Sequence, residues 1–238
     1  MVAAVVPVEA LERSPEQDPA TGWLRHILTG LGLEFADCRA HETADSPALI
    51  DQIAVLEQIQ AAAAAVKAAK IVRFREAQID AQRGDGWDPA TVGRGIADQV
   101  ALACHVSPTE GSRRLERAWA LWHHLPATLD LMAHGRLSEW AAQQVVTETR
   151  HLDSTTRRTV DRKLVDDDRI DTLGVRAVLV RARTRAYAAD PEGYTERGKT
   201  ERKHRRVSIR PAPDTMTWLS GYLPVEQGVA CELVKFSV

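Results

Sequence analysis

The sequence has few cysteines. Only Cys38, Cys104 and Cys231 occur among its 238 residues, and they form no CxxC pair. Their odd number and wide spacing argue against a disulfide framework and against a cysteine-based zinc site. We therefore expect free, buried thiols in a reducing compartment and predict a cytoplasmic location.

Long apolar runs are also missing. No stretch approaches the roughly 18 apolar residues of a membrane span. The N-terminal apolar run 2–8 follows no basic region and contains Pro7, so it does not resemble a secretory signal. The sequence therefore predicts no membrane partner.

Motifs that carry catalysis are absent as well. The sequence contains no GxSxG, no phosphate-binding glycine loop and no Cys–His pairing typical of a nucleophile. His123 and His124 are adjacent, and on a helix such neighbours point about 100° apart and rarely share an ion. The carboxylates at 166–168 and Asp171 lack the spaced acidic loop of a calcium site. We predict no catalytic residue, no metal site and no cofactor.

Alanine and helical periodicity dominate what is present. Aromatic residues make up only 5% of the chain, a composition that favours helices over sheets. A cap at Asp45–Pro47 and a loop at 83–89, with two glycines and a proline, predict one long helix between them. The run 61–65 carries only methyl side chains, so another helix can approach closely. Apolar residues recur at helical spacing at Leu49, Ile53, Leu56, Ile59, Ala63, Val66 and Phe74.

Shorter elements follow the long helix. Gly135 is predicted to cap one helix end and Ser138 the next helix start. Alternation at 206–210 and 217–223 predicts a β-hairpin, and a further helix begins near Val225. The helical segments are predicted at 95–104, 108–124, 126–134, 138–150, 153–168 and 172–189.

These patterns predict a mainly α fold: a multi-helix bundle with a long Ala-rich helix and a small C-terminal β-hairpin. We divide the chain into a loosely structured leader at 1–44, with one short helix around 23–28, and a helical domain at 45–204. The hairpin and the start of a truncated helix take up 205–238. Because an isolated hairpin is marginally stable, we expect it to pack on helices or on a larger whole.

Residues 96–115 resemble a helix-turn-helix, in which the second helix enters the major groove of DNA. Ala101 fits the small residue of the first helix, and Val106 fits the apolar anchor after the turn. His105 stands where glycine is usual, and Gly111 and Arg114 stand where apolar residues are expected, so the match is partial. An ordinary helical corner is the alternative interpretation.

The helix-turn-helix interpretation predicts roles for the second helix. Arg113 and Arg117, four residues apart, would reach phosphates or base edges. Leu115, Trp119 and Trp122 would pack inward.

Basic residues gather in the C-terminal half, although the formal net charge is −2. Residues 150–210 hold seventeen Lys and Arg against ten Asp and Glu, whereas 1–149 is acid-rich. Such a surplus serves phosphate binding or simply keeps helix faces soluble. In its densest part, 197–206, we predict nucleic-acid contacts. The alternative is a solvated helix end neutralised by salt bridges to 166–168. The predicted contact residues are Arg202, Lys203, Arg205 and Arg206.

An ordered set of short segments carries a family resemblance. They read LERA at 115–118, LPAT at 125–128, LMAHGRLS at 131–138, DPE at 190–192, RRV at 205–207 and LSGYLP at 219–224. In this order they resemble the 13E12 repeat family, also called domain of unknown function 222, from about residue 46 to residue 232. The resemblance implies a bacterial domain whose longer members continue into an HNH endonuclease module. No His–Asn–His constellation occurs in this sequence, so nuclease residues are not carried over.

The leading hypothesis is a non-catalytic helical domain, with no enzymatic activity of its own, that positions duplex DNA. The rival is a protein-interaction module or homo-oligomer in which the long helix at 46–82 pairs with a partner. A third hypothesis is a nonfunctional, truncated remnant. The Arg-bearing helix and the resemblance favour the first.

Overall fold

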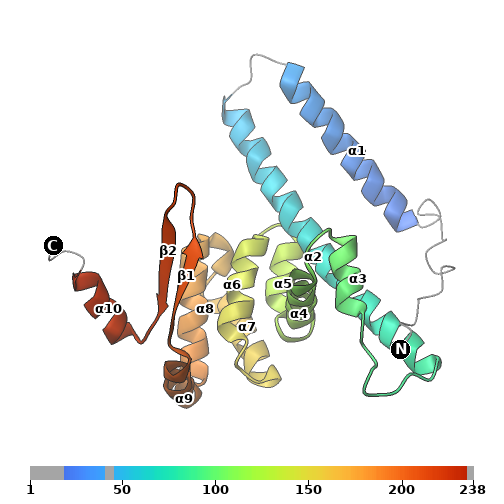
Figure 1. Cartoon of the computed structure of the whole chain (residues 1–238). Coiled ribbons are helices and arrows are strands. Elements are labelled where there is room, and N and C mark those ends of the chain that lie inside the picture. The colour runs from blue at the N-terminus through green and yellow to red at the C-terminus, as the bar shows by residue number, and fades with distance from the viewer. Residues whose placement is uncertain (1–18, 41–45, 235–238) are drawn as a thin grey trace. The chain divides into compact units, whose positions relative to one another are not determined.

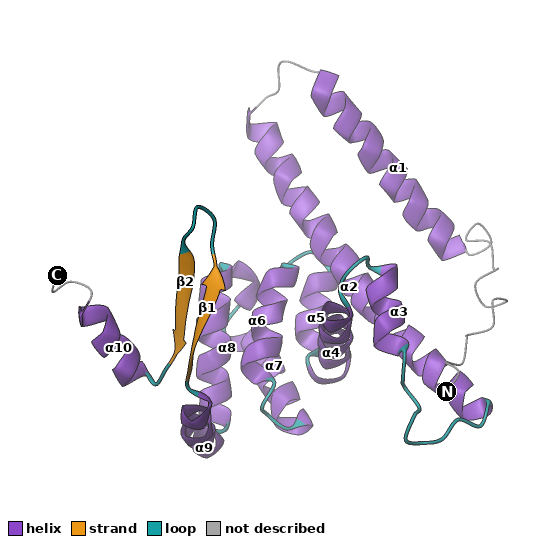
Figure 2. Cartoon of the chain, viewed as in Figure 1, coloured by secondary structure: helices purple, strands orange, loops and turns teal. Residues whose placement is uncertain are grey.

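The computed structural model describes residues 19–40 and 46–234 (Figure 1). It is mainly α, and the described part contains one two-stranded antiparallel sheet (Figure 2). The predicted fold class is confirmed. The chain divides into two compact units, 1–54 and 55–238. This division does not test the predicted domain boundaries at 45 and 205, which stay predictions.

The first unit contains α1, Pro19–Ala40. The predicted leader held only a short helix around 23–28, so that prediction was too short. Apolar residues continue at helical spacing through Leu24, Leu28 and Leu31. The helix also contains Gly22, Gly30 and Gly32, each of which disfavours a helix by about 1 kcal/mol, so a propensity argument missed the continuation.

The long helix α2 spans Ser46–Gly84, as predicted. Its side chains are exposed as far as residue 60, and its buried residues begin at Ala61. Small side chains at Ala61, Ala64, Ala65 and Ala68 form its buried stripe, and the last three belong to the hydrophobic core. The predicted role of the alanine run as a packing surface is therefore confirmed.

The loop after α2 is tied to the helix by one buried side chain. Gln82 is 6% exposed, its Oε1 accepts a hydrogen bond from Gly93 N at 2.6 Å, and its Nε2 donates to Arg94 O at 3.2 Å. Both ends of the amide are thus satisfied inside the protein. This contact fixes where α3 begins.

Six helices then build the bundle, close to their predicted bounds. Ser107, Ser138 and Asp153 cap three of them through side-chain oxygens that accept backbone N–H bonds. Gly135 has φ 69° at a helix end, as predicted. The helices are α3 Ile96–Ala103, α4 Pro108–His124, α5 Pro126–Ala133, α6 Glu139–Thr149, α7 Ser154–Asp167 and α8 Val175–Ala189, with a 3-10 turn, η3, at Ile170–Thr172.

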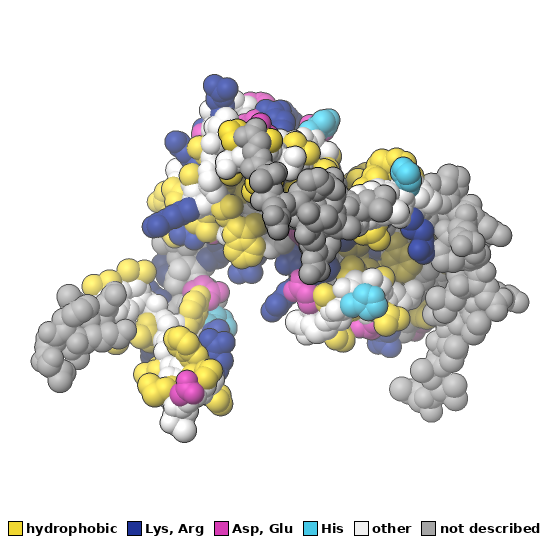
Figure 3. All heavy atoms as spheres, turned by 90° about the horizontal axis from the view of Figure 1, so that it is seen from above, with side chains coloured by type: hydrophobic (Ala, Val, Ile, Leu, Met, Phe, Trp, Pro, Cys, Tyr) yellow, Lys and Arg dark blue, Asp and Glu magenta, His cyan; other side chains and the backbone are white. Residues whose placement is uncertain are grey.

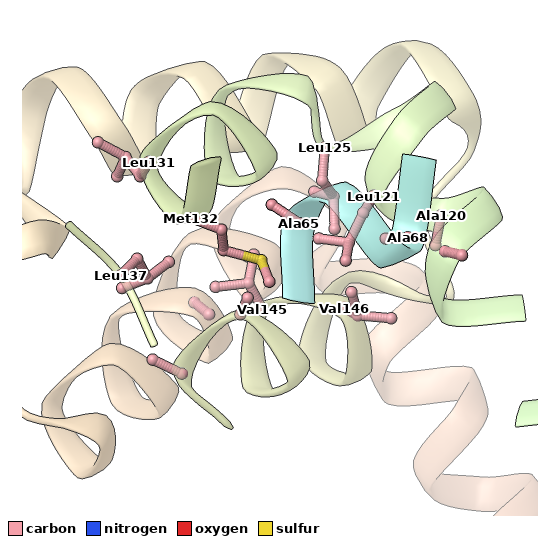
Figure 4. Packing of buried hydrophobic residues seen from close by; sticks show 14 of the residues in the cluster. Ala65, Ala68, Ala120, Leu121, Leu125, Leu131, Met132, Leu137, Val145 and Val146 are labelled. Carbon is pink, nitrogen blue, oxygen red and sulfur yellow. The ribbon is translucent and has the colours of Figure 1, made fainter. Parts of the chain in front are cut away.

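The core lies where α2, α4, α5, α6, α7 and α8 meet. Figure 4 shows Leu121 beside Ala65 and Ala68 of α2, with Met132 near Val145. Met132 is 1% exposed, and Val145 is fully buried. The small residues of α2 admit the larger side chains of α4, which gives interdigitation rather than simple contact.

One buried carboxylate organises the joint between α5 and α7. Asp161 is 1% exposed and accepts hydrogen bonds from Ala127 N at 2.8 Å, Thr128 N at 3.1 Å and Thr128 Oγ1 at 2.5 Å. It thus caps the start of α5 from another helix. Burial raises the pKa of Asp161, and the hydrogen bonds from Thr128 and Ala127 oppose that shift.

The C-terminal part adds α9, Pro191–Glu201, a 3-10 turn η4, Arg202–His204, the strands and α10, Val225–Val234. Strand β1, Arg206–Pro211, pairs with β2, Thr217–Tyr222, in a register that places Ile209 opposite Leu219. The hairpin prediction is confirmed. Every residue of both strands is exposed, so the hairpin does not bury a face within the described part of the chain.

Helix α2 also has the length and composition of a membrane span, the only described helix that does. An 18-residue window within it has a mean hydropathy of 1.3, and 17% of that window is buried. This is weak evidence for a membrane, because core helices of soluble proteins pass the same test. The prediction that the protein has no membrane partner stays a prediction.

Candidate nucleic-acid interface

The corner between α3 and α4 is built on close backbone contact. A β-carbon on Gly111 would lie 2.5 Å from Ala101 Cβ and 2.6 Å from Ala97 O. The position predicted to need an apolar side chain has no room for one. Ala101 is 3% exposed beneath it, as expected of the small residue that lets a second helix cross the first.

The turn of this corner has the backbone conformation that the helix-turn-helix interpretation implies. His105, in the place where glycine is usual, has φ 53° in the left-handed region. Val106 N donates to Ala101 O at 3.0 Å, and Ser107 Oγ accepts from Glu110 N at 3.3 Å to begin α4. The chain therefore passes from α3 to α4 through four residues, about the link length of a helix-turn-helix.

A single carboxylate holds the arginines of α4. Glu110 forms salt bridges with Arg117, with Arg114 at 3.5 Å and with Arg113 at 3.9 Å. The hydrogen bond from Arg117 lowers the pKa of Glu110 by more than burial raises it, and the charge of Arg117 and the hydrogen bond and charge of Arg114 add to the lowering. Glu110 is therefore ionised at neutral pH and competes with any phosphate for these side chains.

The two predicted contacts on α4 differ in exposure. The side chain of Arg113 is 66% exposed, whereas that of Arg117 is 26% exposed. Arg117 lines a small cavity beside Ala68 of α2, so it belongs partly to the helix interface. Of the pair, Arg113 is the one available to a ligand.

The inward-packing prediction holds for two of three residues on α4. Leu115 and Trp119 pack against the core. Trp122 is 39% exposed, so its predicted burial was wrong. Positions three residues apart on a helix differ by about 60° in direction, and Trp122 has turned toward the surface of α5, where it lines a cavity with Leu129.

The second predicted set follows α9 and is partly engaged within the chain. Arg202 forms a salt bridge with Glu226 of α10 at 2.9 Å. The guanidinium of Arg206 lies 5.0 Å from the centre of the Tyr222 ring. Lys203 and Arg205 are exposed and have no salt bridge within the described part of the chain.

The predicted neutralisation of this stretch by residues 166–168 is wrong. Asp168 pairs with Arg185 at 2.8 Å and with Arg181 at 3.9 Å, both on α8. Arg197 pairs instead with Asp190 at 2.9 Å, the residue that caps α9. Asp168 therefore pairs with the neighbouring helix α8 and does not neutralise the cations after α9.

The thiol prediction is corrected in part. Cys104 is half-buried and Cys231 is exposed, and both are free. Burial was expected because free cysteine is usually an interior residue. The side chain of Cys38 lies outside the described residues.

A third cationic site was missed from the sequence. The α4–α7 pocket, about 390 Å³ in volume, is lined by Trp119, His123 and His124 of α4 and by Arg158, Arg162 and three hydroxyl side chains of α7. The i, i+4 spacing of the arginines and the histidine pair at the end of a predicted helix were the available signals. The described residues contain no group of three or more His, Cys, Asp or Glu suited to a metal ion.

A family model described as "Domain of unknown function (DUF222)" matches residues 53–234. The chain belongs to the DUF222 family. The match begins within α2 and runs to the last residue of α10, so the DUF222 domain includes the α3–α4 corner, the α4–α7 pocket and the hairpin. The family description names no activity. The chain has no significant match among curated proteins or among solved structures.

Proposed function

We propose that this DUF222 domain is a non-catalytic module that binds duplex DNA through its phosphates and positions it. The observation that carries the proposal is the α3–α4 corner, where Gly111 lies against Ala101 and the chain turns through His105. This geometry supports a helix-turn-helix role, and α4 carries an exposed arginine, Arg113, on its first half.

The chemistry of the interface would be electrostatic. Lys203 and Arg205 have the greatest freedom to bind phosphate, and Arg113 follows because its pair with Glu110 is long, at 3.9 Å, and exposed. Arg117 and Arg202 must first leave closer partners, Glu110 and Glu226. Phosphate contacts fix orientation without reading sequence. In longer members of the family, such a module would hold DNA for an HNH endonuclease, a role that the resemblance alone suggests.

Fluorescence polarisation of a labelled duplex tests the proposal. Wild-type protein should bind at micromolar concentrations at about 50 mM salt and lose affinity steeply as salt rises. The variant Arg113→Gln/Arg205→Gln should bind more weakly than Arg73→Gln/Arg83→Gln, a control that removes the same charge from α2. The control arginines pair with Glu76 and Asp80 on their own helix. Absence of wild-type binding at micromolar protein ends the DNA proposal.

A different observation favours a second function, self-association through α2. Large apolar side chains on its first half are exposed at helical spacing, Ile53 by 60% and Leu56 by 42%. Figure 3 shows exposed apolar side chains, in yellow, among the basic ones on the surface in view. Exposed apolar stripes of this kind commonly mark protein contacts.

Light scattering decides between the two functions. The second function predicts a species of twice the 26.3 kDa chain mass, insensitive to salt and lost in Ile53→Glu. A wild-type monomer at all concentrations rejects it. A dimer that also binds DNA would combine the two functions.

A further inference from the structure

The α4–α7 pocket is a cationic site apart from the predicted contact residues. Its lining combines two arginines, two histidines and three hydroxyl groups, and it includes no carboxylate. Elsewhere on this domain most arginines face an acid, as Arg183 faces Glu148 and Arg185 faces Asp168. A site without such neutralisation attracts an anion.

Arg158 is held in place by the backbone of α4. Its Nε donates a hydrogen bond to His123 O at 2.7 Å. This bond fixes the guanidinium at the edge of the pocket, and its two terminal nitrogens have no hydrogen-bond or salt-bridge partner within the described residues. Arg162 lies one helical turn further along α7, also exposed and without an acidic partner among those residues. A fixed planar fork suits phosphate oxygens, because little side-chain entropy remains to be lost.

The histidines supply buried polar atoms that the described residues leave unsatisfied. His123 Nε2 and His124 Nδ1 are both buried and find no hydrogen-bond partner there. Buried nitrogens in this condition are rare and call for a partner. Both rings line the pocket, so an oxygen-rich group inside it could accept or share these bonds.

Trp119 forms an apolar wall of the same pocket. The His123 ring lies 3.9 Å from the Trp119 ring, centre to centre, and the Arg75 guanidinium of α2 lies 4.0 Å from that ring. Arg75 adds a third cation near the site and has no salt bridge within the described part of the chain. The wall also excludes water from one side, which strengthens charge interactions at the pocket.

Two acidic residues of α7, Asp153 and Asp161, are already engaged in hydrogen bonds. Asp153, at the start of α7, accepts hydrogen bonds from Thr155 N and Thr156 N, so it caps the helix. Asp161, a buried residue of α7, accepts hydrogen bonds from the start of α5. The site therefore does not depend on the amino end of α7, which its own cap already satisfies.

We propose that the α4–α7 pocket binds a phosphodiester group of a nucleic-acid backbone, with Arg158 and Arg162 as the ion-pair partners and His123 and His124 as hydrogen-bond partners. The proposal rests on the DNA-binding function above. It moves a principal phosphate contact from the first half of α4 to its last turn and to α7. Both arginines are exposed at the edge of the pocket, so a phosphate within a long nucleic-acid backbone can reach them.

The same polarisation assay tests the pocket with a different pair of variants. Arg158→Gln/Arg162→Gln should weaken duplex binding about tenfold at about 50 mM salt and reduce the slope of log affinity against log salt by about 0.9, the value for one phosphate contact. The control Lys163→Gln/Arg176→Gln removes the same charge from exposed positions outside the pocket. It should change affinity less than about threefold.

Two further measurements keep the outcome unambiguous. Arg162→Gln alone breaks no hydrogen bond or salt bridge described within the chain, so its loss of affinity cannot come from misfolding. Imidazole nitrogen NMR signals of His123 and His124, assigned with His123→Asn and His124→Asn, should shift when unlabelled duplex is added.

Each result either supports or overturns the inference. Wild-type binding that the pocket and control variants weaken equally overturns the pocket and leaves the DNA function standing. Absence of wild-type binding overturns both. A selective loss in Arg158→Gln/Arg162→Gln with shifted histidine signals supports the pocket.

Discussion

Gly111→Ala should destabilise the domain, although alanine is the better helix former. The added β-carbon would meet Ala101 Cβ at 2.5 Å and Ala97 O at 2.6 Å, far inside van der Waals contact. One obstacle is a backbone atom and the other is a β-carbon, so neither can rotate away. Helix α3 must move off α4, and that movement loosens Ile96, which is 1% exposed.

The magnitude follows from two opposing effects. Overpacking of a close contact costs about 3 kcal/mol at its upper range, and the helix propensity of alanine over glycine returns about 1 kcal/mol. The expected net loss is about 2 kcal/mol, or about 4–8 °C in Tm for a domain of this size. Urea unfolding followed by far-ultraviolet circular dichroism measures it.

Two variants sharpen this experiment. Gly198→Ala in α9 is the matched control, because nothing lies within 4 Å of its new β-carbon, and it should stabilise by up to about 1 kcal/mol. Ala101→Gly in the Gly111→Ala background removes the 2.5 Å contact but not the one with Ala97 O, so it should restore part of the loss. If Gly111→Ala is as stable as the wild type, the close crossing of α3 and α4 is refuted.

Three other perturbations have definite expected outcomes. Asp161→Ala leaves buried donors at Ala127 and Thr128 without an acceptor. This should lower the free energy of unfolding by about 3 kcal/mol in chemical denaturation. Asp161→Asn should lower it less, and equal losses would contradict the capping role. Gly135→Ala should lower the unfolding free energy by about 2 kcal/mol, because φ is 69° and the new β-carbon would lie 2.6 Å from Gln58 Cβ; an unchanged Tm would argue against this. Burial, and then the charge of Arg197, lower the pKa of His151 from 6.5, so the folded state favours its neutral form, and stability should fall as pH drops through and below 6.5. In a Tm series from pH 7.5 to 5.5, His151→Gln should show a smaller fall than the wild type, and identical falls would exclude this histidine.

The helices could be predicted from the sequence because their signals are local. Ser107, Ser138 and Gly135 mark helix ends by caps and by a left-handed residue, and the structure places the ends there. Helix α1 was underestimated because its interior glycines oppose its apolar periodicity. Local propensity and apolar periodicity disagree in that segment, and local propensity is the weaker guide.

The candidate site was less predictable because salt bridges are long-range. The sequence indicates that Arg113 and Arg117 share a helix face, but not that Glu110 holds both. Nor does it indicate that Asp168 is taken by α8 rather than by the cations after α9. Such salt bridges depend on which helices become neighbours, and the spacing of residues along the chain does not show this.

The α4–α7 pocket illustrates the same limit. His123 and Arg158 are thirty-five residues apart and meet only because α4 lies against α7. The sequence argument against a metal site at the histidine pair rests on helical geometry alone. A phosphate-binding role for these histidines also needs Arg158 and Arg162 of α7. The histidine pair in the sequence does not indicate that these arginines lie beside it.

The salt dependence of duplex DNA binding tests the central claim most directly. The claim is that the helical scaffold presents cations to phosphates without catalysing any reaction. Affinity measured from about 50 to 200 mM salt should fall with a slope of log affinity against log salt of about −0.9 for each phosphate contacted, and of about −3 or steeper in total. The duplex should remain uncut. A slope near zero, or no binding at the lowest salt, would contradict the account.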